Sequence, residues 1–86
     1  MPNESLQLMY ANALLHAGKT DAAIATLTPL SKNASNRLHF AADWYIAVAY
    51  LKADNRAAAR QELEKIVAMH TQDGYLKEAK NLLQKL

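Results

Sequence analysis

The stretch Tyr10-Ala11-Asn12-Ala13-Leu14-Leu15-His16-Ala17-Gly18 is echoed 36 residues later by Ile46-Ala47-Val48-Ala49-Tyr50-Leu51-Lys52-Ala53-Asp54. The apolar positions that follow keep the same offset: Ala23, Leu27 and Leu30 in the first copy, Ala59, Leu63 and Ile66 in the second. A period of this length is typical of helical-hairpin repeats, in which each repeat is one pair of antiparallel helices. The sequence therefore predicts stacked helical hairpins.

Composition indicates one all-α domain over residues 1–86. The chain has 86 residues, of which 51% are hydrophobic, enough for one core. It contains two glycines and two prolines, and its β-branched residues do not alternate with polar residues as a half-buried strand requires. We expect helices and no strands.

Apolar spacing predicts five helices, arranged as two hairpins and a capping helix. The first, third and fifth helices should cover about residues 4–17, 37–53 and 74–86. The second should begin at about Asp21, and the fourth should follow the Asp54-Asn55 turn and reach His70. The first repeat then spans about 4–33, the second about 37–70, and the capping helix about 74–86. A lone amphipathic helix after the last full repeat has the character of a helix that covers an exposed terminal face.

Turn chemistry supports these boundaries. Gly18 can end the first helix in a left-handed conformation, and Asp54-Asn55 takes the place of Gly18-Lys19 in the second repeat, where it can cap the fourth helix. Pro29 lacks an N–H group, so we expect it to kink the second helix or to split off its last turn.

The first and third helices each carry two apolar stripes. The first has one stripe of Leu6, Tyr10, Ala13, Leu14 and Ala17 and a second of Leu8, Asn12 and Leu15, so we expect it to contact its own hairpin partner and something else. The third pairs a stripe of Ile46, Ala47 and Tyr50 with another of Phe40, Trp44, Val48 and Leu51. We expect the third helix to be the central, most buried element.

At these residues the chain resembles the tetratricopeptide repeat, in its divergent bacterial form. Ala11 and Ala47 match the small residue where two helices cross closely, and Tyr50 matches the aromatic position of the first helix. Leucine replaces phenylalanine in the second-helix pattern, and the closing proline is absent from both repeats. The resemblance covers essentially the whole chain and implies a helical-hairpin solenoid that binds other proteins.

By this resemblance, the first helix of each hairpin lines a concave groove. The predicted groove residues are Leu8, Asn12, Leu15, Trp44, Tyr45, Val48 and Leu51. They are mostly apolar, so an amphipathic helix or a second copy of the domain would suit them better than a carboxylate-terminated peptide. For Trp44 the alternative is that it packs between neighbouring helices.

The charge pattern argues against a nucleic-acid partner. A net charge of +2 arises from scattered lysines and arginines, whereas phosphate binding usually needs a clustered basic face. The longest apolar stretch, residues 40–53, is too short for a bilayer and contains Asp43 and Lys52, so we expect no membrane insertion. With no cysteine, the compartment stays open: cytoplasmic, or periplasmic within a larger anchored chain.

No combination of residues indicates catalysis, a metal or a cofactor. His16, His39 and His70 fall on three helices without ligand-like spacing. His39 and Asp43, four residues apart, could form an oriented imidazole, but no nucleophile with an oxyanion hole accompanies them. Gly18 and Gly74 are isolated, so no phosphate-binding loop is expected.

These observations lead to a non-enzymatic module that binds a protein or peptide segment in an apolar groove. The alternative is a self-associating fragment of a longer repeat array or of a membrane-anchored protein, with a possible homodimer.

Overall fold

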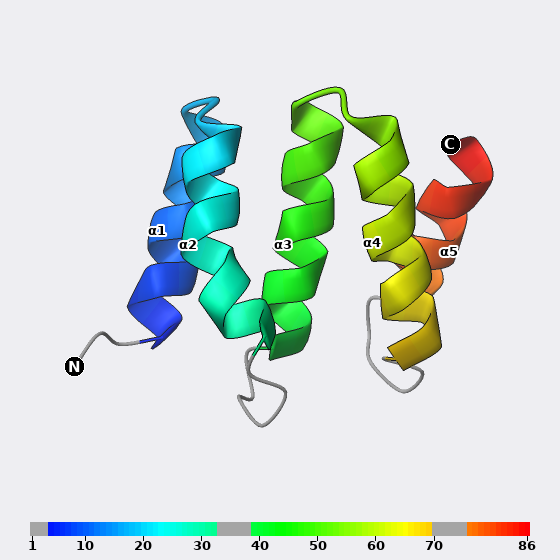
Figure 1. Ribbon diagram of the computed structural model, residues 1–86, viewed down its shortest axis with the longest axis horizontal. Helices are drawn as coiled ribbons and strands as arrows, with labels where there is room; N and C mark the ends of the chain where they lie inside the picture. The colour runs from blue at the N-terminus through cyan, green and yellow to red at the C-terminus, as the bar shows by residue number, and fades with distance from the viewer. Residues whose placement is uncertain (1–3, 33–38, 70–75) are drawn as a thin grey trace.

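The computed structural model describes residues 4–32, 39–69 and 76–86, and these residues form five helices. Figure 1 shows the helices side by side in chain order. The helices are α1 (Glu4–His16), α2 (Thr20–Lys32), α3 (His39–Lys52), α4 (Arg56–Met69) and α5 (Leu76–Lys85). Within the described ranges there is no strand, which confirms the predicted all-α class and the five helices. None of these helices has the length and hydropathy needed to cross a bilayer.

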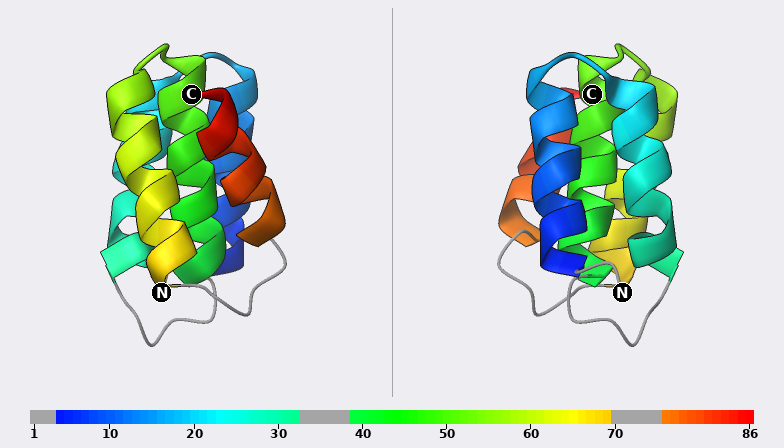
Figure 2. Two further views of the ribbon diagram at one scale, coloured as in Figure 1. Left: turned by 90° about the vertical axis from the view of Figure 1, so that its right-hand side faces the viewer. Right: turned by 90° about the vertical axis from the view of Figure 1, so that its left-hand side faces the viewer.

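Each helix packs against the next one along the chain, and α3 also touches α1. Figure 2 shows α2 and α4 on one side of the molecule and α1 and α5 on the other, with α3 between them. The shortest dimension is 17 Å, which is room for two layers of helices spaced about 8–10 Å apart. Every helix therefore keeps one side at the surface.

The hydrophobic core repeats with the period of the sequence. One cluster joins Ala11, Leu27 and Leu30 of the first hairpin to Ala42 and Ile46 of α3. A second joins Ala47, Leu63 and Ile66 of the second hairpin to Ala79 of α5, and Leu82, Leu83 and the following Leu86 pack against it. Ala47, Leu63 and Ile66 lie 36 residues after Ala11, Leu27 and Leu30. Equivalent residues therefore hold α3 on the first hairpin and α5 on the second.

The two hairpin turns repeat as well. The N–H groups of Gly18 and Lys19 donate to the carbonyls of Leu15 and Leu14, at 3.1 and 2.8 Å, and this pair of bonds is the Schellman pattern that closes a helix. Asp54 and Asn55 make the same two bonds, to Leu51 and Tyr50, at 3.1 and 2.9 Å. Gly18 and Asp54 both have positive φ, 79° and 60°. The predicted equivalence of the two turns is confirmed.

Asn55 also caps α4 as predicted, because its side-chain oxygen accepts the N–H of Ala58 at 3.2 Å. Of the two predicted effects of Pro29, the splitting off of a last turn does not occur, since α2 continues through it to Lys32. The two residues after Pro29 explain this. Leu30 is buried in the core and Ser31 is bonded to α3, so tertiary contacts hold the final turn in place.

The core-facing side of α1 takes residues from both predicted stripes. Leu6 and Tyr10 of the first stripe are 59% and 60% exposed. The buried residues are Ala11, Leu14 and Leu15. Because α1 is apolar on both sides, its periodicity alone did not decide which side faces the core.

Substitutions at the positive-φ residue of each hairpin turn should change the stability of the fold in opposite directions. Gly18→Ala should lower the free energy of unfolding by about 1 kcal/mol, because alanine is strained at positive φ while the space around Gly18 is empty. Asp54→Gly should raise it by about 0.5 kcal/mol, because glycine adopts this conformation without a Cβ clash. Urea denaturation of both variants measures the changes; a loss of stability in Asp54→Gly would contradict the strain argument.

Candidate functional site

The seam between α1 and α3 brings together four of the predicted groove residues. Leu8 and Tyr45 both pack against the core cluster of Ala11 and Ile46. Tyr45 also packs, with Val48, against a neighbouring cluster that contains Leu15. Leu8, Tyr45 and Val48 are half-buried, so part of each remains at the surface, whereas Leu15 is only 3% exposed and belongs to the core.

Trp44 lies away from this seam. It is half-buried and packs with Phe40 against the cluster of Ala47, Leu63 and Ile66, on the side of α3 that faces α4 and α5. Of the two sequence interpretations of Trp44, this contact matches packing between neighbouring helices. Asn12 and Leu51, the last two predicted groove residues, are half-buried on α1 and α3. Of the seven residues, Leu15 therefore lies in the core, and Trp44 packs toward α4 and α5 rather than toward α1.

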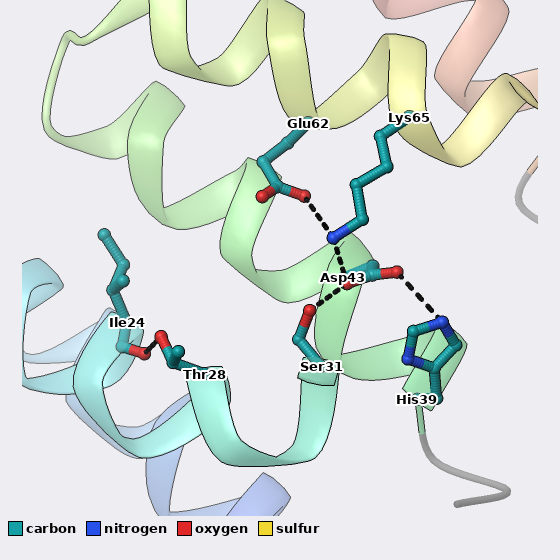
Figure 3. Close-up of polar contacts among 7 residues, drawn as sticks. All are labelled: Ile24, Thr28, Ser31, His39, Asp43, Glu62 and Lys65. Atoms are coloured by element: carbon teal, nitrogen blue, oxygen red, sulfur yellow. Dashed lines mark hydrogen bonds and ion pairs between the residues drawn. The ribbon is translucent and has the colours of Figure 1, made fainter. Parts of the chain in front are cut away.

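The most concentrated polar chemistry in the described part of the chain surrounds Asp43. Its carboxylate is fully buried, and Figure 3 shows it between three helices. The hydroxyl of Ser31 on α2 donates a hydrogen bond to Oδ1, and Nζ of Lys65 on α4 lies 3.4 Å from the same oxygen. Nε2 of His39, one turn earlier on α3, lies 3.5 Å from Oδ2, as the spacing of four residues had suggested.

Glu62 borders this cluster, and the pKa of its carboxyl group is shifted. Burial raises the pKa of its carboxyl group above the ordinary value of 4.5, the charge of Lys65 acts in the opposite direction, and that of Asp43 raises the pKa further. Oε2 of Glu62 lies 3.9 Å from Nζ of Lys65, beyond hydrogen-bond distance. Lys65 thus stands between two acids, with its stronger contact at Asp43.

The arrangement of Ser31, His39 and Asp43 does not match a nucleophilic triad. In such a triad the hydroxyl is hydrogen-bonded to the imidazole, which takes its proton, and the acid holds the far side of the ring. Here the Ser31 hydroxyl and the His39 imidazole both point to the Asp43 carboxylate. The hydroxyl therefore donates its hydrogen bond to the acid and not to the imidazole. The geometry is that of a structural anchor for a buried charge.

Sequence reasoning found the His39 and Asp43 pair but missed Ser31 and Lys65. The signal available was an acid placed in the most apolar helix, since a buried carboxylate requires partners. Spacing could not name those partners because they lie 12 and 22 residues away, on other helices.

At the opposite end of the molecule is an open depression between the first hairpin turn and the end of α3. It is lined by Leu15, His16, Gly18, Thr20, Asp21, Lys52 and Ala53. Most of these side chains are exposed, and the two charged ones have opposite signs. Within the described ranges, no three His, Asp or Glu side chains gather as they would around a metal ion.

Comparison with protein-family models, with curated proteins and with solved structures finds no match to this chain.

Removing the central carboxylate should destabilise the fold. Asp43→Ala leaves Ser31 and His39 beside a buried space without their acceptor, while Lys65, whose side chain is 39% exposed, can turn back toward water. We expect a loss of about 1 to 3 kcal/mol in the free energy of unfolding. The matched variant Asp21→Ala, at an exposed acid, should cost less than about 1 kcal/mol. Equal urea midpoints for the two variants would contradict the anchoring role.

Glu62 should make stability depend on pH. Its raised pKa means that, from about pH 4.5 upward to the folded pKa, the folded state holds a proton that the unfolded state has released. Stability from this group is therefore lost as pH rises through that window. Glu62→Gln should remove this loss, so the free energy of unfolding of the variant relative to the parent chain should rise with pH. Glu64→Gln, at an exposed acid of the same helix, should show no such trend. Parallel stability curves for the parent chain and Glu62→Gln would refute the assignment.

Proposed function

We propose that this chain is a non-enzymatic scaffold, similar to a tetratricopeptide repeat domain, that binds a protein segment along the surface of α1 and α3. The observation that carries the proposal is the seam itself. Leu8, Tyr45 and Val48 meet there from two helices and remain only half-buried, beside the half-buried amide of Asn12. Apolar side chains with a few polar neighbours are the usual lining of a recognition surface.

The repeated core supports the scaffold part of the proposal. In repeat proteins each unit buries its apolar face on the next, and a final helix closes the stack. The matching clusters at Ala11 and Ala47, and the amphipathic α5 over the second, agree with that plan. The exposed side of α5 is polar, as a terminal helix requires: Lys77, Glu78, Lys80, Asn81, Gln84 and Lys85.

An amphipathic helix is the partner segment that suits the seam best. Its apolar residues, spaced i, i+3, i+4 and i+7, would contact the exposed parts of Leu8, Tyr45 and Val48. The amide of Asn12 could accept or donate one hydrogen bond at the border of that contact. The polar groups around Asp43 bond to one another inside the fold, so this cluster gives no argument for a catalytic role.

Self-association is the second candidate, and one observation favours it. Three of the large hydrophobic side chains that are more than half exposed lie on α1: Leu6, Met9 and Tyr10. A dimer could cover them. Light scattering over a dilution series would separate the candidates, since self-association predicts a mass that rises with concentration.

Binding at the seam can be tested with a displayed library of amphipathic helical peptides. Peptides that bind should perturb the NMR amide signals of α1 and α3, and Asn12→Arg should weaken them at least about tenfold, because a long cation would project over the apolar floor. Asn12 belongs to no core cluster, so the free energy of unfolding should change by less than about 0.5 kcal/mol. The control Gln61→Arg, on the exposed side of α4, should leave affinity unchanged. Peptides that perturb the amide signals of other helices only, or whose affinity is unchanged by Asn12→Arg, would show that the seam is not the binding site.

A further inference from the structure

We draw no further inference here: the strongest candidate, the exposed apolar side of α1 that carries Leu6, Met9 and Tyr10, supports none, because nothing in the described part of the chain shows what covers it.

Discussion

The buried carboxylate of Asp43 is the constraint on which the packing of the central helices depends. Burying an ionised carboxylate away from water costs several kcal/mol in folding free energy unless hydrogen-bond donors surround its oxygens. Here the donors come from three helices: Ser31 on α2, His39 on α3 itself and Lys65 on α4. A slide of α2 or α4 along α3 by one turn would remove a donor from the carboxylate. Asp43 thus fixes a register that aliphatic contacts alone would fix less sharply.

Around this anchor, small residues let the helices approach closely. Ala11, Ala42, Ala47, Ala49 and Ala79 have essentially no exposed surface, and each lies where one helix crosses another. Large side chains at Leu27, Leu63 and Ile66 fill the space beside them. The same alternation of small and large residues in two clusters explains why a helix as different in composition as α5 can occupy the place on the second hairpin that α3 occupies on the first.

Sequence periodicity predicted the helices and the turns because both depend on local chemistry. The positive φ at Gly18 and Asp54 and the cap at Asn55 follow from residues within one turn. The side of α1 that faces the core does not follow from local chemistry, because Leu6 is as apolar as Leu14 and Leu15, and only the presence or absence of a neighbouring helix separates them. Trp44 was ambiguous for the same reason. The partners of Asp43 lie too far along the chain for spacing to identify them.

The arrangement of α1 has a consequence for how the protein could act as a scaffold. One side meets α3 through Leu8 and Leu15, and the opposite side, which carries Met9 and Tyr10, is exposed. An occupant of one side leaves the other uncovered, so binding at the two sides is not mutually exclusive on steric grounds.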